Sequence, residues 1–423
     1  MTFRKLKLRE NLLKKQNNNF LPRLSRLCRE SLLYMTSRIL LSISAIISLL
    51  IFNHSVFHKT ERAELSLSSE VTFSAVGDLM CHSPQFEYAR TSDGGFNFEM
   101  NYYYVREIIS RSNIAFANFE TVLAGRERKF SGYPTFNTPD EFLQAVKNAG
   151  FDFLFTSNNH SFDRGREGVK KTILKIKKSG LGFAGTSLSE KESDSLRIIK
   201  INDVTAGILS YADHLNGFKL PKGENYLVNL IDSARIRRDI LRLRKEKPDL
   251  VILYFHFGDE YQKEPSRYQK QIVRTAITAG ADIILASHPH VLQRIETFKP
   301  VNSSLDTGFV AYSLGNFISN QRWRYSDAGT ILNFSIIKES GNSIKLKKIE
   351  ITPTWVYKGK FILENIFAVL PSELAFQDKY PPFLSKNDLM KMRESYLDAE
   401  KILLKGFRLS PSKIILKKFP HLN

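Results

Sequence analysis

The stretch at positions 250–293 constrains the fold most, because it joins two largely apolar runs through a segment with helical spacing. The runs, at 250–255 and 282–286, are rich in β-branched residues and lack the alternation of a half-exposed strand. This pattern is typical of strands buried on both faces of a parallel sheet. Between them, apolar residues recur at helical spacing until Gly280 ends the segment. The stretch therefore predicts a βαβ unit and an α/β fold.

Histidines follow both runs: His256 comes after the first, and His288 and His290 come after the second. In open α/β sheets, ligands bind beyond the carboxyl ends of the strands, where these histidines are expected. Three imidazoles at neighbouring strand ends exceed what a packed core requires. They indicate a ligand site that other strand ends complete.

Three earlier apolar segments, at 71–76, 114–118 and 151–156, are also predicted strands that end in polar residues. These polar residues are Asp78, Asn118, Glu120, Asn158, Asn159, His160 and, three positions further on, Asp163. Each has a structural explanation when taken singly, because Asp caps helices and Asn-His pairs are common in turns. Their repetition at successive strand ends favours one shared site.

The residue types at this site predict its chemistry. Carboxylate, amide and imidazole ligands together suit Mn, Fe or Zn rather than a structural zinc site with thiolates. A carboxylate among histidines can bridge two ions about 3.5–4 Å apart, which can activate water and hold a phosphate in line. His160 is expected to protonate a leaving oxygen, with Asp163 orienting its ring.

The amino-terminal region predicts a membrane anchor. Residues 1–38 carry +8 of the net charge of +19, and the next 19 residues, 39–57, contain no charged side chain. This length is sufficient to span a bilayer, and the preceding basic residues predict a single pass with the leader in the cytoplasm and the main domain outside. A cleaved signal peptide and a buried helix are the alternatives. The polar segment 58–70 is a predicted linker.

The basic leader lacks the aromatic interleaving or finger spacing of nucleic-acid-binding segments, so anionic lipid headgroups are its expected partner and no nucleic acid is expected. The two cysteines, Cys28 and Cys81, lie on either side of the predicted anchor and predict no disulfide framework.

Six ordered motifs between positions 71 and 351 resemble the CapA family, the poly-γ-glutamate capsule biosynthesis group of the calcineurin-like metallophosphoesterase superfamily. The motifs are Gly77-Asp78, Asn118-Phe119-Glu120, Ser157-Asn158-Asn159-His160 with Asp163, His256-Phe257-Gly258 with Glu260, the segment from Gly280 to His290, and Tyr312 to Phe317 with Asn316. No single motif is specific, but their number and order are. The chain departs from the superfamily pattern at Met80, where a first-motif histidine is usual, and at Glu120, where the bridging residue is usually Asp.

The resemblance implies a two-sheet αββα sandwich over 71–355, in a bacterial cell-surface setting. Beyond it, the residues themselves predict a basic and partly helical extension at 356–423. The resemblance further implies two divalent ions, with Asp78, Glu120, Asn159, His256, His288 and His290 as ligands. It also implies His160 and Asp163 in catalysis. Residues expected to contact substrate or support the ligands are Asn118, Asn158, Glu260 and Asn316.

Three functions are compatible with this sequence. The first is an anchored extracytoplasmic CapA-like protein that serves synthesis, export or assembly of an anionic polymer, with metal-dependent hydrolase capacity and polymer-synthase subunits as possible partners. The second is a phosphomonoesterase or phosphodiesterase acting on an exported phosphate compound. The third is a non-catalytic scaffold, because a fold does not determine a function.

Overall fold

The computed structural model describes residues 69–339, 343–405 and 414–416. The chain divides into the units Met1–Leu67 and Ser68–Asn423, and all of the described residues belong to the second unit. The predicted leader, the predicted anchor at 39–57 and most of the predicted linker lie outside the described residues. Within the described part of the chain, no helix combines the length and apolar character needed to cross a membrane.

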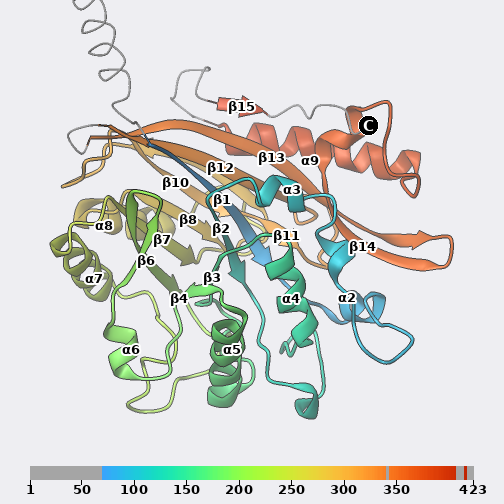
Figure 1. The fold of residues 1–423 in the computed structure, drawn as a ribbon, viewed down its shortest axis with the longest axis horizontal. Coiled ribbons are helices and arrows are strands. Elements are labelled where there is room, and N and C mark those ends of the chain that lie inside the picture. The colour runs from blue at the N-terminus through green and yellow to red at the C-terminus, as the bar shows by residue number, and fades with distance from the viewer. Residues whose placement is uncertain (1–68, 340–342, 406–413, 417–423) are drawn as a thin grey trace, which may run out of the picture. The chain divides into compact units, whose positions relative to one another are not determined.

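The described residues form two mixed sheets (Figure 1). The larger has nine strands in this part of the chain, of which seven run in the order β14-β13-β12-β1-β2-β3-β4, while β11 pairs with β1 and β15 pairs with β13. The strands are β1 (Ser69–Leu79), β2 (Ile114–Phe119), β3 (Phe153–Phe155), β4 (Gly182–Ala184), β11 (Asn316–Ile318), β12 (Ala328–Lys338), β13 (Ile344–Phe361), β14 (Glu364–Pro371) and β15 (Ile414–Leu416). Strands β1 to β4 are parallel, β12 is antiparallel to β1, β13 is antiparallel to β12 and β14, and β15 is parallel to β13.

The smaller sheet has six strands among the described residues, in the order β5-β6-β7-β8-β10-β9. Their bounds are β5 (Arg197–Ile201), β6 (Val204–Ala212), β7 (Leu250–His256), β8 (Ile283–Ser287), β9 (Leu292–Phe298) and β10 (Gly308–Leu314). Strands β6, β7, β8 and β10 are parallel, so their carboxyl ends meet at one edge.

The two sheets pack face to face, as β7 demonstrates. Its even-numbered residues from 250 to 254 belong to the core shared with the larger sheet, and its odd-numbered residues from 251 to 255 belong to a core shared with helices. Because successive side chains of a strand point to opposite faces, a strand between two cores must be apolar throughout. This explains the unbroken apolar run in the sequence.

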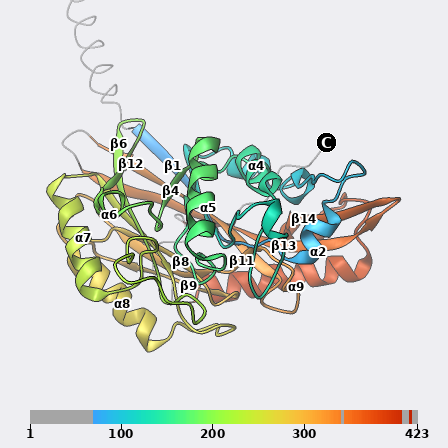
Figure 2. The same cartoon turned by 90° about the horizontal axis from the view of Figure 1, so that it is seen from below.

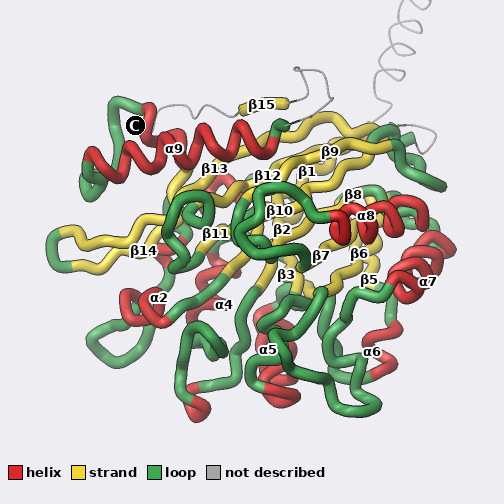
Figure 3. The backbone as a smooth tube through the Cα atoms, turned by 180° about the vertical axis from the view of Figure 1, so that it is seen from behind, coloured by secondary structure: helices red, strands yellow, loops and turns green. Residues whose placement is uncertain are grey.

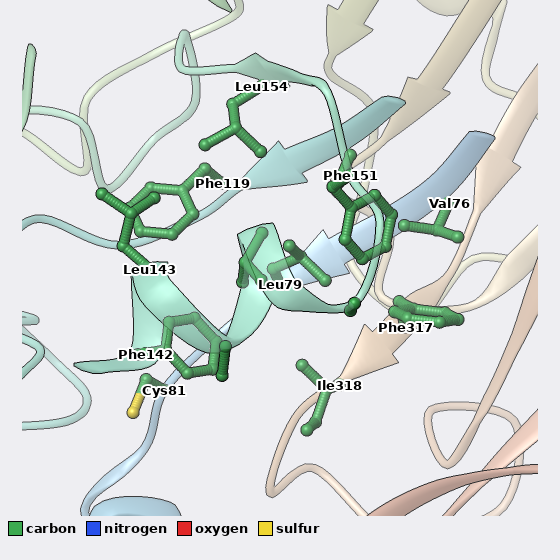
Figure 4. Close-up of a cluster of buried hydrophobic side chains, with 14 of the residues drawn as sticks. Val76, Leu79, Cys81, Phe119, Phe142, Leu143, Phe151, Leu154, Phe317 and Ile318 are labelled. Atoms are coloured by element: carbon green, nitrogen blue, oxygen red, sulfur yellow. The ribbon is translucent and has the colours of Figure 1, made fainter. Parts of the chain in front are cut away.

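The longer helices cover the outer faces of the sheets. Helices α4 (Asp140–Asn148) and α5 (Gly165–Ser179) pack on the larger sheet, and α7 (Ser233–Lys245) and α8 (Arg267–Ala279) pack on the smaller one, where they lie side by side (Figure 2). Figure 4 shows part of the core under α4, in which the rings of Phe142 and Phe119 are 6.1 Å apart. The short helical segments are α2 (Ser83–Tyr88), α3 (Arg106–Ile109), α6 (Glu190–Asp194), and the 3₁₀ turns η1 (Glu99–Asn101), η2 (Arg126–Arg128) and η3 (Ser372–Phe376).

Helix α9 (Lys386–Leu403) lies along β13 and next to β9, and it covers the part of the same face of the larger sheet that the smaller sheet does not reach (Figure 3). Its Leu389 and Met392 pack with Trp355 of β13 and Leu370 of β14 in a separate core. The layer that covers this face of the larger sheet is therefore part sheet and part helix.

The prediction of an α/β fold with two sheets is confirmed, with differences in detail. Strand β1 does not end before Gly77 but continues through Asp78, whose backbone N–H donates to the Gly315 carbonyl at 3.0 Å. The domain boundary predicted at 355 falls inside β13, because this strand runs on to Phe361 and pairs with β14.

Gly77, near the carboxyl end of β1, lies so close to the backbone of Gly315 that no side chain fits there. This close approach leads to a prediction. A Cβ at this position would lie 1.9 Å from the Gly315 carbonyl oxygen, which is backbone and cannot move aside. We expect Gly77→Ala to lower the free energy of unfolding by about 3 kcal/mol or more, measured by urea denaturation. The control is Gly95→Ala, where the nearest atom would be a threonine side-chain oxygen and a change below about 0.5 kcal/mol is expected. Equal stability of both variants would contradict this packing.

Candidate metal centre

The carboxyl ends of parallel strands from both sheets converge on one cluster of polar residues. Asp78 lies near the end of β1, and Glu120 follows β2, with its N–H donating to the Leu79 carbonyl at 3.1 Å. Asn159 follows β3, and His256 is the last residue of β7. The face-to-face packing of the two sheets therefore brings residues separated by well over a hundred positions into contact.

Asp78, Glu120 and His256 form a buried group whose ligand atoms all lie within 4.8 Å of one another. His256 Nε2 is 3.6 Å from Glu120 Oε1 and 2.8 Å from Asn159 Oδ1, while its Nδ1 is 3.9 Å from Asp78 Oδ1. Four of the predicted metal ligands thus meet at one point.

His288, His290 and Glu260 form a second group with the same 4.8 Å spacing of ligand atoms. The two histidines are buried, and Glu260 is exposed on the loop after β7. Tyr261, the next residue, donates its backbone N–H to the Pro289 carbonyl at 2.7 Å, which holds this loop against the histidine segment. His288 and His290 have φ values of 104° and 56°, a backbone conformation that only a few per cent of non-glycine residues adopt.

The two groups adjoin each other. His290 Nδ1 is 3.4 Å from Asp78 Oδ2, and the rings of His256 and His288 have centres 4.8 Å apart. The six predicted ligands are therefore brought together, with Glu260 beside them.

Three of the predicted supporting residues lie behind this cluster and are fully buried. Asn118 donates to Asp78 Oδ1 at 2.8 Å and lies 3.1 Å from His256 Nδ1. Asn158 donates to the Asn118 side chain at 3.2 Å. Asn316 places its Oδ1 3.0 Å from His290 Nδ1. These carboxamides orient the ring or carboxylate in front of them, as residues behind a metal site do.

His160 lies beside the cluster, and each of its two ring nitrogens has a neighbouring polar side chain. Its Nδ1 is 2.8 Å from Asp163 Oδ2, and the same carboxylate oxygen accepts the backbone N–H of Phe136 at 2.7 Å. Its Nε2 is 3.4 Å from the Asn216 side chain, which also accepts a hydrogen bond from Asn159. The predicted His160–Asp163 pair is thus formed, and Asn216 is a neighbour that the sequence did not indicate.

The burial of the cluster alters the proton affinities of its members. Burial, followed by the nearby Asp78 charge, raises the pKa of Glu120 well above its usual range. Burial, followed by the neighbouring imidazoles, lowers the pKa of His256 and of His288 well below the usual value. For His290, burial opposes protonation, but hydrogen bonding to Asp78 and its charge outweigh it and raise the pKa.

Three buried polar atoms of the cluster have no hydrogen-bond partner among the described residues: both carboxylate oxygens of Glu120 and His288 Nδ1. Leaving such atoms unpaired in a protein interior costs free energy, so native proteins pair nearly all of them. Oxygen and nitrogen lone pairs directed at one point suit a divalent cation such as Mn, Fe or Zn. The residues therefore fit the metal that the sequence predicted.

The cluster opens into a cleft of about 710 Å³. Asn159, His160, Glu260 and His290 contribute to its lining. His82, which follows β1, also lines this cleft, and burial lowers its pKa to about 4. The cleft is large enough to admit a substrate beside the histidines.

Residues 72–321 match the family model for the bacterial capsule synthesis protein PGA_cap. The chain belongs to this family. The resemblance to CapA is thereby confirmed, and all six predicted ligands lie within the matched region.

Two relatives in the family are similar over most of their length. The capsule biosynthesis protein CapA of Bacillus anthracis is 26% identical, over 69% of this chain and 69% of the relative. The PGA biosynthesis protein CapA of Bacillus subtilis is 27% identical, over 78% of this chain and 86% of the relative. Among solved structures, the calcineurin-like phosphoesterase YfkN of Bacillus subtilis aligns with a TM-score of 0.39 and 11% identity, over 79% of this chain and 99% of that one. This distant likeness transfers neither an activity nor a site.

The unpaired carboxylate of Glu120 leads to a prediction about stability. In protein stripped with a chelator, we expect Glu120→Gln to leave the melting temperature unchanged or raise it, because a neutral group replaces a buried carboxylate without partners. Adding Mn²⁺ at a hundred times its Kd should stabilise the wild type by about 2.7 kcal/mol and the variant by less. Thermal denaturation with and without Mn²⁺ measures both effects. An undiminished response of the variant to Mn²⁺ would exclude Glu120 as a ligand.

Proposed function

We propose that this protein is an extracytoplasmic, membrane-anchored hydrolase that depends on two divalent ions and acts in the synthesis, export or assembly of an anionic surface polymer. Membership of the capsule synthesis family supports the process. The uncharged segment 39–57 after a basic leader supports the location. The observation that carries hydrolysis is the buried cluster of unpaired carboxylate and imidazole atoms next to an open cleft that Asn159, Glu260 and His290 line.

The ligands we propose are Asp78, Glu120, Asn159, His256, His288 and His290, with Glu260 as a seventh. Divalent ions held there would polarise the scissile group and lower the pKa of a bound water. Glu120 would hold an ion together with Asp78 and His256, because neither of its oxygens has a hydrogen-bond partner in the described structure.

His160 supplies the proton in this proposal. Its Nδ1–H donates to Asp163, which leaves Nε2 on the cleft side to carry the proton that is transferred. Hydrolysis adds water across the bond, and the leaving oxygen takes its proton from Nε2 as the bond breaks. Asp163 is fixed by the Phe136 N–H, so that it holds the ring orientation throughout.

A second candidate function is a general phosphomonoesterase or phosphodiesterase on an exported phosphate compound. The observation favouring it is the ligand set itself, since two ions beside a histidine can serve any phosphoester of suitable shape. Turnover of aryl phosphates and diesters by the full chain with Mn²⁺, compared with action on surface polymer, separates the two functions. A protein without either activity that still binds polymer would instead be the scaffold considered from the sequence.

The assignment of Glu260 is tested by Glu260→Gln. The substitution removes one of three ligands of the second group, so bound metal should fall from about two ions per chain to about one. Elemental analysis of the purified protein measures this. The matched control is Glu264→Gln in the same loop, because Glu264 pairs with Arg294 at 2.5 Å and with Lys405 instead. Equal metal content in the two variants would show that Glu260 is not a ligand.

The role of His160 is tested by separating metal binding from turnover. We expect His160→Ala to retain its metal and to lose about 10²–10⁴-fold in kcat on a phosphoester with a poor leaving group. The loss should be smaller on an aryl phosphate, whose leaving oxygen needs less protonation. Asp163→Asn should show the same dependence on leaving group with a smaller loss. Loss of metal from His160→Ala would make this residue part of the metal-binding cluster instead.

A further inference from the structure

The walls of the cleft carry a set of exposed aromatic side chains. These are Tyr133, Phe218, Tyr261 and Trp323, which we call the aromatic rim. Tyr133 is 70% exposed and Trp323 is 53% exposed, although burying such rings is favourable. Four large exposed rings around one cleft indicate a surface that a ligand covers.

The aromatic rim lies next to the proposed reaction centre. The ring centre of Tyr261 is 6.1 Å from that of His290, and Trp323 is 5.6 Å from Tyr261. Tyr133 has its ring centre 6.4 Å from that of His160. A molecule held on these rings would therefore reach both the metal-binding histidines and the proposed proton donor.

No lysine or arginine lines this cleft in the described part of the chain, although the sequence contains 62 of them. Other cations lie near the rim without lining the cleft: Lys358 donates to Asn320 Oδ1 at 3.4 Å, and Lys263 Nζ is 4.0 Å from the centre of the Tyr325 ring. Arg324, next to Trp323, makes two hydrogen bonds to Asp398 at 3.0 and 3.2 Å, and Arg322 donates to the Val356 carbonyl. Among the described residues, the lining of the cleft itself therefore contains no lysine or arginine side chain.

Carboxamides take the place of cations in the lining. Asn216, Asn320 and Gln321 contribute to the walls together with Asn159. Each carboxamide can both donate and accept hydrogen bonds, which matches hydroxyl groups better than it matches a row of carboxylates. Burying carboxylates against such walls without counter-charges would cost free energy.

We propose that the aromatic rim binds neutral pyranose rings, so that the segment of substrate beside the metal centre is a glycan. Flat aromatic faces pack against the C–H faces of a pyranose, and neighbouring carboxamides bond its hydroxyls. A polyglutamate chain would present one carboxylate per residue to walls that lack cations. This inference rests on the proposed function only in placing the reacting bond at the metal cluster.

The two tryptophans of the chain make the test direct. Trp355 is 1% exposed and donates to Asp327 at 3.0 Å, so ligands in the cleft should change the fluorescence of Trp323 alone. The full chain, treated with chelator in a detergent without sugar headgroups, is titrated with chitohexaose, maltohexaose, cellohexaose and poly-γ-glutamate. We expect saturable quenching by at least one neutral hexasaccharide, and no such signal in Trp323→Phe.

Calorimetry gives the affinities for the same ligands. Tyr261→Ala and Tyr133→Ala should each weaken binding of that hexasaccharide about ten-fold, and Tyr103→Ala, which removes an exposed ring outside the cleft, should not. Poly-γ-glutamate binding that depends on the rim, without binding of any neutral hexasaccharide, would overturn the proposal, as would an absence of all binding. Sugar binding without turnover would remove the proposed hydrolysis and leave this inference intact, since no step of the test requires metal.

Discussion

The stack of Phe155 on Tyr254 is the contact on which the site depends. The two rings have centres 4.3 Å apart and planes 13° apart, and they join β3 of the larger sheet to β7 of the smaller one. Both strands end within a few residues of the stack, so the contact fixes His256 at the end of β7 relative to Asn159 after β3. The 2.8 Å contact between those two side chains follows from the packing of the sheets. The packing of the two sheets therefore determines the geometry of the site.

The same packing that builds the site also makes it unfavourable without a cation. Asp78, Glu120 and His256 are withdrawn from water, yet neither carboxylate oxygen of Glu120 has a hydrogen-bond partner in the described structure. A few unpaired buried groups of this kind are comparable in cost to a sizeable part of a domain's net stability. The rest of the core must supply that free energy, and the apolar strands on either side do so. Buried ligand atoms that lower stability are typical of a functional site that binds a cation.

The sequence predicted a strand correctly where both faces of that strand are buried. Strands β7 and β8 lie between two cores, so their unbroken apolar runs could be recognised, and the polar residues after them stood out. Strands β5, β9 and β14 were not predicted, because each lies at a sheet edge, where apolar patterning is weaker. The proximity of Glu260 to His288 could not be predicted either. It follows from a loop conformation that a backbone hydrogen bond to Pro289 holds, and no periodicity records such a contact.

Helix α9 adds a constraint that the family match does not include, since that match ends at residue 321. Asp398 of this helix binds Arg324 in the loop that carries Trp323, and Lys405, just beyond the helix, pairs with Glu264 in the loop that carries Tyr261. The helix itself is fixed by its apolar side chains against β13 and β14. Exposed ion pairs contribute little to global stability, so their effect here is local. They restrict two loops whose side chains line the cleft, and the carboxyl-terminal region thereby shapes the walls of the cleft.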